Sequence, residues 1–313
     1  MSTRKLRIGT RGSQLALWQA NWVKQALADL YPDTPIEITV IKTSGDKILD
    51  VPLAKVGGKG LFVKEIEQAL VDGEIDLAVH SMKDMPGDIP EGLCFGGIPK
   101  REIPYDVLIS RENIELKNLR RGACIGTSSL RRASQVLYMR PDIQITPLRG
   151  NLDTRLKKLT SENLDAIILA GAGVKRLNLE HVISEVLDPG LILPAVGQGA
   201  LCIEVRRNDA DVRDLIAPLN HETTNRIVTS ERAFLKRLEG GCQVPMAAFG
   251  RIASDTLTLE GMVAETDGSI MYHQTLAGPV SHAEAIGHDL AGRLIDRGAD
   301  KIIARLNEEA NPQ

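Results

Sequence analysis

The chain has 313 residues, of which 43% are apolar and 25% are charged, and its formal net charge is -3. A chain of this length seldom folds around a single hydrophobic core, so we expect two or three domains. The near-neutral charge argues against a generally basic nucleic-acid binder, and no stretch approaches the roughly 20 apolar residues of a membrane span.

The first eighty residues alternate between strand-like and helix-like periods of hydrophobicity. We expect strands at 6–10, 36–41 and 75–80 and helices at 14–30 and 61–71. This βαβαβ order predicts a parallel sheet. Ser13 stands where the N-cap of the first helix belongs. The apolar face expected for that helix consists of Leu15, Trp18, Trp22, Ala26 and Leu30.

A second unit of the same kind follows the Pro-containing stretch KREIPYD. We expect strands at 123–127, 143–148 and 165–170 and helices at 130–139 and 152–159. IGTRGS in the first unit and IGTSSL in the second both end a strand and open a helix, where backbone N–H groups suit an anion. The likeness of these six residues is either an internal duplication or a coincidence.

The third region predicts a small α+β domain. Its expected helices are 222–238 and 282–297, and its alternating segments LTLEGMV and SIMYHQTL predict strands. The apolar face of the first helix carries Ile227, Phe234 and Leu238, and KIIARL is expected to be a last short strand.

Positive residues gather at loops and helix starts in both α/β units. If the carboxyl ends of the strands face one crevice, these residues converge there and hold a polyanion. Arginine predominates in the second unit and suits bidentate pairing with carboxylate or phosphate. The alternative is that each is a solvated surface residue. The residues concerned are Arg11, Lys83, Arg131, Arg132, Arg149, Arg155 and Arg176.

The stretch LAVHSMKDMP places Asp84 after a strand and two residues before Pro86. It is either an ordinary turn residue or a carboxylate in a cationic crevice that stabilises a positive intermediate or passes a proton. His80 is expected to be packed or hydrogen-bonded at the strand end, because no serine or cysteine nucleophile lies near it in the sequence.

Four scattered cysteines form no C-x-x-C pair, so neither a zinc site nor a disulfide framework is expected. Cys94, Cys124 and Cys202 lie in apolar runs and are expected to be buried. Cys242 lies instead in the loop sequence GGCQVP, after a helix whose C-terminal dipole does not favour a thiolate. The N-terminus lacks the apolar run of a secretory signal, and a cytoplasmic location is expected.

Seven motifs in order along almost the whole chain resemble the porphobilinogen deaminase (hydroxymethylbilane synthase) family. They are TRGSQLALWQA, VGGKGLFVKEIE, DLAVHSMKDMP, GTSSLRR, LRGN-x-x-TRL, AVGQGAL and ERAFLKRLEGGCQVP. The resemblance implies an α/β fold with two periplasmic-binding-protein-like lobes of mixed, mainly parallel sheets and a smaller α+β C-terminal domain. The implied boundaries are 1–100 with 197–219 for the first lobe, 104–195 for the second and 220–313 for the third domain.

The same resemblance implies a transferase that condenses four porphobilinogen molecules head to tail, releasing four ammonia, to hydroxymethylbilane in tetrapyrrole (haem) biosynthesis. Asp84 would be its catalytic carboxylate, and Cys242 would hold a dipyrromethane cofactor through a thioether. The other implied cofactor-binding residues are Lys83, Ser129, Arg131 and Arg132. The implied substrate-binding residues are Arg11, Ser13, Arg149, Arg155 and Arg176.

The resemblance further implies a monomer that uses no metal, binds no nucleic acid or membrane, and passes its product to uroporphyrinogen-III synthase. Two other functions stay open at this point. One is a two-lobed anion-binding protein without chemistry, which the fold permits because fold does not fix function. The other is a nucleic-acid or phosphate binder that uses the arginine-rich second lobe.

Overall fold

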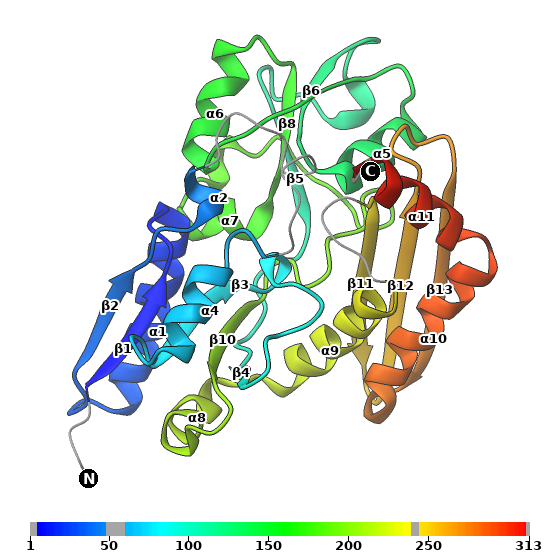
Figure 1. Cartoon of the computed structure of the whole chain (residues 1–313). Coiled ribbons are helices and arrows are strands. Elements are labelled where there is room, and N and C mark those ends of the chain that lie inside the picture. Colours follow the sequence, from blue (N-terminus) through cyan, green and yellow to red (C-terminus); the bar gives the residue numbers. More distant parts are fainter. Residues whose placement is uncertain (1–4, 48–59, 239–243, 311–313) are drawn as a thin grey trace. The chain divides into compact units, whose positions relative to one another are not determined.

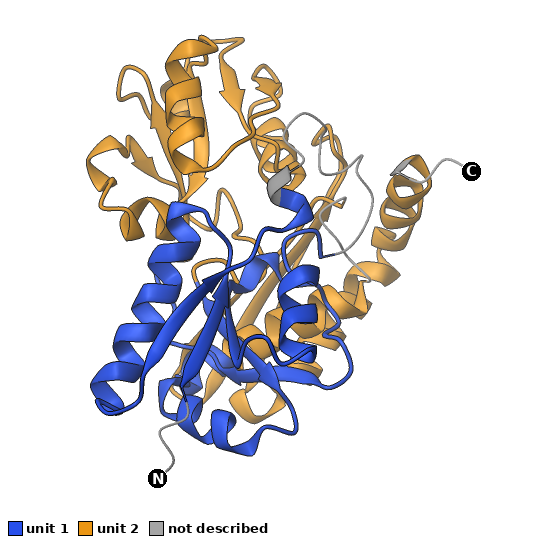
Figure 2. Cartoon of the chain, turned by 60° about the vertical axis from the view of Figure 1, so that its left-hand side comes forward, with its two compact units in different colours: residues 1–49, 58–102, 200–225 blue, residues 50–57, 103–199, 226–313 orange. Residues whose placement is uncertain are grey.

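The computed structural model describes residues 5–47, 60–238 and 244–310 (Figure 1). The chain divides into two compact units, which Figure 2 colours separately. The first unit combines Met1–Leu49, Gly58–Glu102 and Ala200–Asn225. The second combines Asp50–Gly57, Ile103–Gly199 and Arg226–Gln313. The division into three domains with the boundaries given above stays a prediction.

The first unit contains a five-stranded sheet of order β2-β1-β3-β10-β4. Its strands are β1 (Leu6–Thr10), β2 (Ile36–Val40), β3 (Leu77–Ser81), β4 (Leu93–Gly97) and β10 (Leu201–Arg206). β1 pairs in parallel with β2 and β3, whereas β10 runs antiparallel to β3 and β4. The chain therefore returns to the first sheet late in the sequence, as the resemblance implies.

Helices cover both faces of this sheet. They are α1 (Gln14–Leu30), α2 (Ser44–Lys47), α4 (Lys64–Val71) and α8 (Ala210–Ile216), with 3-10 turns η1 (Met82–Asp84) and η4 (Ala217–Leu219). The α1 face that packs on the sheet carries Ala20, Val23 and Leu27. The apolar face predicted for this helix is wrong, because Trp22 is 39% and Leu30 47% exposed. Helix spacing alone cannot show which of two partly apolar stripes meets the sheet.

The sheet of the second unit has the order β7-β6-β8-β5-β9. Its strands are β5 (Asp106–Ser110), β6 (Cys124–Gly126), β7 (Gln144–Thr146), β8 (Ala166–Ala170) and β9 (Glu185–Val186). The accompanying elements are α5 (Leu130–Met139), α6 (Leu152–Ser161), α7 (Gly171–Arg176), η2 (Leu116–Asn118) and η3 (Glu180–Val182). β6 is parallel to β7 and β8, whereas β5 is antiparallel to β8 and β9, so the two sheets share one pattern of parallel and antiparallel pairs.

A separate antiparallel sheet forms the C-terminal part of the second unit. It consists of β11 (Met246–Ala253), β12 (Thr256–Ala264) and β13 (Met271–Pro279). The helices are α9 (Glu222–Arg237), α10 (Ala283–Asp296) and α11 (Ala299–Ala310), with the 3-10 turn η5 (Val280–His282). Phe234 and Leu238 join the core of this sheet, as predicted, and Ile227 packs against it half-buried.

The last short strand predicted at 301–306 is wrong, because this segment lies within α11. Ile302, Ile303 and Leu306 are buried together in the C-terminal core, at a spacing that fits one helix face. A short apolar run cannot by itself distinguish a strand from a buried helix.

The α/β class, with two lobes and a smaller C-terminal domain with its own sheet, is confirmed by the sheets. No helix in the described part of the chain is both long and apolar enough to cross a membrane.

Candidate active site

Two parallel strands of the first unit bring predicted site residues to one edge of the sheet. β1 and β3 are neighbours, and their carboxyl ends lead to Arg11 and Ser13 and to Asp84. Ser13 is the N-cap of α1, as predicted, and its Oγ accepts a hydrogen bond from the Ala16 N–H at 3.3 Å. These residues therefore lie at the edge of the sheet where open α/β sheets commonly bind ligands.

The turn that carries Asp84 is fixed by the apolar residues around it. Met82 and Met85 are buried, and the Met82 N–H donates to the Ala200 carbonyl at 3.0 Å. The 3-10 turn η1 between them leaves Lys83 and Asp84 exposed. The sequence MKDM thus anchors two apolar side chains and directs two charged ones outward.

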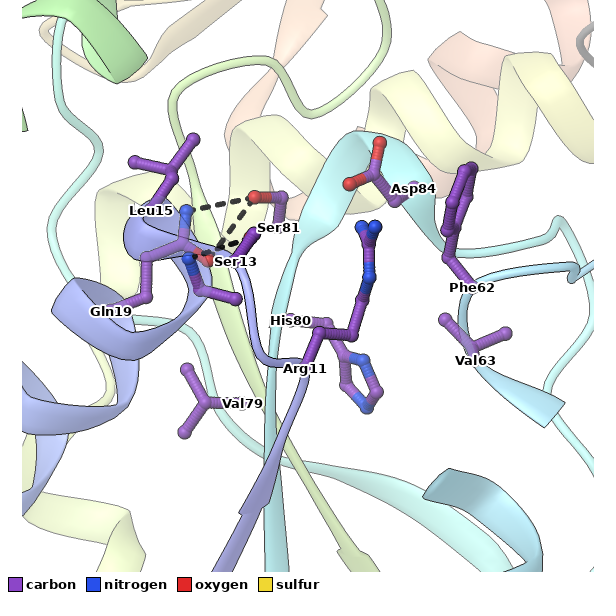
Figure 3. Close-up of a pocket in the computed structure, with 11 residues that line it drawn as sticks. Arg11, Ser13, Leu15, Gln19, Phe62, Val63, Val79, His80, Ser81 and Asp84 are labelled. Carbon is purple, nitrogen blue, oxygen red and sulfur yellow. Dashed lines mark hydrogen bonds between the residues drawn. The ribbon is translucent and has the colours of Figure 1, made fainter. Parts of the chain in front are cut away.

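A pocket lies at this edge of the first unit (Figure 3). The Arg11 guanidinium lies over the Phe62 ring, 4.1 Å from its centroid, and extends toward the Asp84 carboxylate in Figure 3. A cation over an aromatic face is held electrostatically, so Phe62 fixes the direction of Arg11. The polar lining residues are Arg11, Ser13, Gln19, His80, Ser81 and Asp84. Lys83 is not among them.

The wall of this pocket includes a buried histidine with a carboxylate partner. His80 Nε2 lies 3.1 Å from Oε2 of Glu204, and both side chains are buried. His80 is thus hydrogen-bonded at the strand end, as the sequence predicted. Glu67 of α4 is also buried, and its burial, together with the nearby Glu204 charge, raises its pKa to about 7.

In the second unit, the start of α5 presents two arginines to one buried aspartate. Asp106 Oδ2 accepts from Arg131 Nη1 at 2.7 Å, and Oδ1 accepts from Arg132 Nη2 at 2.7 Å. Ser129 caps the helix by accepting from the Arg132 N–H. Both guanidinium groups are buried, so neither is a solvated surface residue. One carboxylate for two guanidinium groups leaves an excess positive charge.

The pKa of Asp106 reflects these neighbours. Burial on its own raises the pKa of a carboxyl group, but the charges and hydrogen bonds of Arg131 and Arg132 outweigh burial and hold it well below its usual range. Gln198 Nε2 donates to the same Oδ1 at 3.0 Å. Asp106 is therefore an anion that organises the start of α5.

The other predicted arginines of the second unit follow β7 and β8. Arg149 and Arg155 are half-buried, and Arg155 Nε donates to the Gly150 carbonyl at 2.8 Å. Asn151 caps α6 by accepting from the Thr154 N–H at 2.9 Å. Arg176 is buried at the end of α7 and donates to the Gly199 carbonyl at 2.8 Å. β6, β7 and β8 are parallel, so these arginines and Ser129 follow the same edge of their sheet.

Cys242 lies outside the described residues. The chain on either side is held in the C-terminal core by buried Leu238 and Val244. Of the other cysteines, Cys202 is buried as predicted, whereas Cys94 and Cys124 are half-buried. The expectation of full burial fails for these two because strand periodicity does not fix the depth of each position.

Sequence reasoning missed three polar residues of these sites. Glu204 had a signal, since one acidic residue interrupts the apolar strand LCIEV. Glu67 lies in a helix with a second acidic residue, Glu65, and nothing local marks Glu67 as the buried one. Asp106 receives its partners from α5, and its sequence neighbours do not reveal them.

Comparison with known proteins shows the family. The model of the porphobilinogen deaminase dipyromethane cofactor binding domain matches residues 6–214, and that of the porphobilinogen deaminase C-terminal domain matches residues 226–296. The chain is 55% identical over 312 residues to the porphobilinogen deaminase of Syntrophotalea carbinolica, covering 100% of this chain and 99% of that protein. It is 56% identical over 306 residues to that of Geobacter metallireducens, covering 98% and 96%.

Among solved structures, the chain is similar to the periplasmic aliphatic sulphonate binding protein SsuA from Escherichia coli, with a TM-score of 0.42 and 19% identity. That match covers 75% of this chain and 70% of the other, and it carries no functional conclusion. The family models and curated relatives define an enzyme, a transferase of tetrapyrrole biosynthesis. The chain belongs to the porphobilinogen deaminase family, and its cofactor is dipyrromethane.

The residues present fit this cofactor. Dipyrromethane carries several carboxylates, and the Arg131, Arg132 and Asp106 cluster has a net positive charge. Guanidinium groups bind carboxylates with charge-assisted hydrogen bonds. Within the described residues, no three His, Cys, Asp or Glu side chains are grouped as metal ligands.

Proposed function

We propose that this enzyme joins four porphobilinogen molecules head to tail, taking up one water and releasing four ammonia, to form hydroxymethylbilane. The pocket that places the exposed carboxylate of Asp84 beside the Arg11 guanidinium carries the proposal. A carboxylate stabilises the positive charge that develops as ammonia leaves, and a guanidinium binds an acidic side chain of the pyrrole. Membership of an enzyme family counts against the anion-binding protein without chemistry.

Asp84 is assigned the catalytic role. Asp84 follows β3 on a turn whose backbone is anchored by buried Met82 and Met85, and its carboxylate is exposed. A carboxylate held close to the reacting carbon and to the amine can steady the cation and transfer protons between them.

The cationic residues are assigned to the carboxylates. Substrate is bound by Arg11, Ser13, Arg149, Arg155 and Arg176, and cofactor by Lys83, Ser129, Arg131 and Arg132. What supports this assignment is that the residues follow the carboxyl ends of parallel strands in each unit. The buried pairing of Arg131 and Arg132 with Asp106 makes them preorganised donors.

Cys242 is assigned as the covalent attachment point of dipyrromethane, through a thioether. When bound, the cofactor supplies the pyrrole carbon to which the first substrate is joined. A thioether resists the thiol exchange that reduces disulfides in a reducing compartment. This fits the proposed cytoplasmic location. We further propose that the enzyme is a monomer. Its product would pass to uroporphyrinogen-III synthase.

Intact-mass spectrometry of the purified enzyme tests the proposal. We expect a mass above that of the polypeptide by one dipyrromethane, and the bare polypeptide mass for Cys242→Ala. Cys124→Ala, which removes a half-buried cysteine from the second unit, is the control and should keep the adduct. A wild-type protein without adduct that leaves porphobilinogen unchanged would contradict both the attachment and the reaction.

A further inference from the structure

Three ionisable side chains lie near one another between α4 and the sheet of the first unit, namely Glu67, His80 and Glu204. In the antiparallel pairing of β3 and β10, Cys202 lies opposite His80, so the His80 and Glu204 side chains lie on one face of the sheet. Buried Ala78 on this face packs with the α4 residues Ile66 and Leu70. Glu67 follows Val63 by one helical turn, and Val63 lines the pocket of Asp84. His80 therefore lies in the pocket wall, and its neighbours Glu204 and Glu67 lie behind that wall.

The hydrogen bonds of this cluster are incomplete. His80 Nε2 meets Oε2 of Glu204 at 3.1 Å. Oε1 of Glu204 and Oε1 of Glu67 are buried and have no hydrogen-bond donor in the described part of the chain. With both carboxylates ionised, their charges exceed what one imidazole can balance. Buried charge without a partner is costly, so a proton on one carboxylate is the favoured state.

Glu67 is the carboxylate that holds this proton. Glu204 already has His80 as its partner, whereas burial and then the Glu204 charge raise the pKa of Glu67 to about 7, against the weaker opposing effects of His80 and Lys64. Two other cations stand on strands packed against α4, namely Arg7 of β1 and Arg206 of β10. Both are bound to Asp76, and Arg206 also to Asp209.

We propose that Glu67 is a further positioning residue for the reaction, which holds a proton behind the Asp84 pocket and acts through Glu204 and His80. With the proton in place, the cluster carries one negative charge fewer beside the pocket, and a carboxylate-bearing substrate is admitted. Loss of the proton adds a buried negative charge behind an anion-binding pocket and repels that substrate. This inference rests on the proposed function, because it takes porphobilinogen to enter this pocket.

The test compares the KM of wild type and Glu67→Gln for porphobilinogen at pH 6 and pH 8. The wild-type KM should rise about fivefold between the two pH values, the order expected for one partly screened charge. Glu67→Gln cannot ionise and should show a flat KM. Glu74→Gln, an exposed change of the same charge, should behave as wild type.

Thermal unfolding of the same proteins gives a readout independent of activity. A raised pKa means that the folded state holds a proton which the unfolded chain has already lost, so stability falls as pH rises from about 4.5 to about 7. Between pH 5 and pH 8, the Tm of wild type should therefore fall by about 2–4 °C relative to the Tm of Glu67→Gln. Glu204→Gln removes a neighbouring charge and should shift the wild-type transition to lower pH.

The outcomes separate this inference from the function on which it rests. If wild type turns over porphobilinogen and its KM changes with pH as that of Glu67→Gln does, the positioning role is wrong. If the unfolding transition appears but no variant binds or converts porphobilinogen, Glu67 holds its proton and the proposed substrate is wrong. Equal pH dependence of Tm in wild type and Glu67→Gln overturns the proton assignment itself.

Discussion

At the scale of single residues, Asp84 combines exposure with a fixed backbone. Asp84→Asn keeps the size of the side chain and removes its charge, so we expect the Tm to stay near that of wild type while kcat falls at least about 100-fold. Steady-state kinetics with porphobilinogen and a thermal melt measure the two effects. Glu91→Gln, an exposed change of the same charge, should leave both unaltered. An Asp84→Asn enzyme with near-normal kcat would remove Asp84 from the chemistry.

For Asp106 we predict a large loss of stability, unlike for Asp84, because the Asp106 carboxylate is buried between two guanidinium groups. Asp106→Asn leaves these groups without their anion and should cost about 3–5 kcal/mol of unfolding free energy at neutral pH. The lowered pKa of Asp106 means that its contribution is present above the ordinary carboxyl pKa and is lost as pH falls below it. Denaturant unfolding at pH 7 measures the difference.

The half-buried pair Arg140 and Asp142 supplies the control for this measurement. Asp142→Asn breaks an ion pair of similar length that solvent reaches and partly screens, so its effect should be smaller. Comparable losses for Asp106→Asn and Asp142→Asn would show that burial does not strengthen the first pair.

At the scale of elements, the loop between β7 and α6 depends on one glycine. Gly150 has a φ of +114°, and a Cβ built there would lie 2.5 Å from Cγ2 of Thr154. Gly150→Ala should therefore destabilise the enzyme by about 1–2 kcal/mol and raise KM, since Arg149 lies in this loop and Arg155 donates to the Gly150 carbonyl. Urea unfolding and kinetics measure the two effects.

A glycine within α10 is the matched control. A Cβ at Gly292 would meet nothing within 4 Å, so Gly292→Ala should stabilise the helix by about 0.5–1 kcal/mol and leave KM unchanged. A stabilising Gly150→Ala would show that the loop adopts another backbone conformation.

The elements also show how much of the fold can be predicted from the sequence. The βαβ order, the N-cap Ser13 and the helices at 14–30 and 130–139 follow from local periods and capping, and the structure confirms them. The run KIIARL within α11 is too short to reveal its helical period, so the strand predicted from it is wrong. Asp106 and Glu67 gain their character from partners on other elements, which no local pattern encodes. The roles assigned to the site residues derive from the family resemblance and stay predictions.

At the scale of the whole molecule, the first unit is assembled from distant parts of the chain. β10 lies between β3 and β4, so Ala200–Asn225 is integral to this sheet. We expect residues 1–102 joined to residues 200–225 by a flexible linker of about 15 residues to unfold cooperatively. Residues 1–102 alone should not. Circular dichroism during thermal unfolding distinguishes the two, and a cooperative transition of the shorter piece would show that β10 is dispensable.

The late position of β10 also bears on how the protein is made. A ribosome releases the chain from its N-terminus, and β4 finds no neighbour in the described sheet until the segment Leu201–Arg206 has emerged. In that interval the edges of β3 and β4 are open to pairing with other nascent chains. Slow translation of the middle of the message would lengthen this exposure, and so the demand for chaperones should grow with the time spent on residues 103–199.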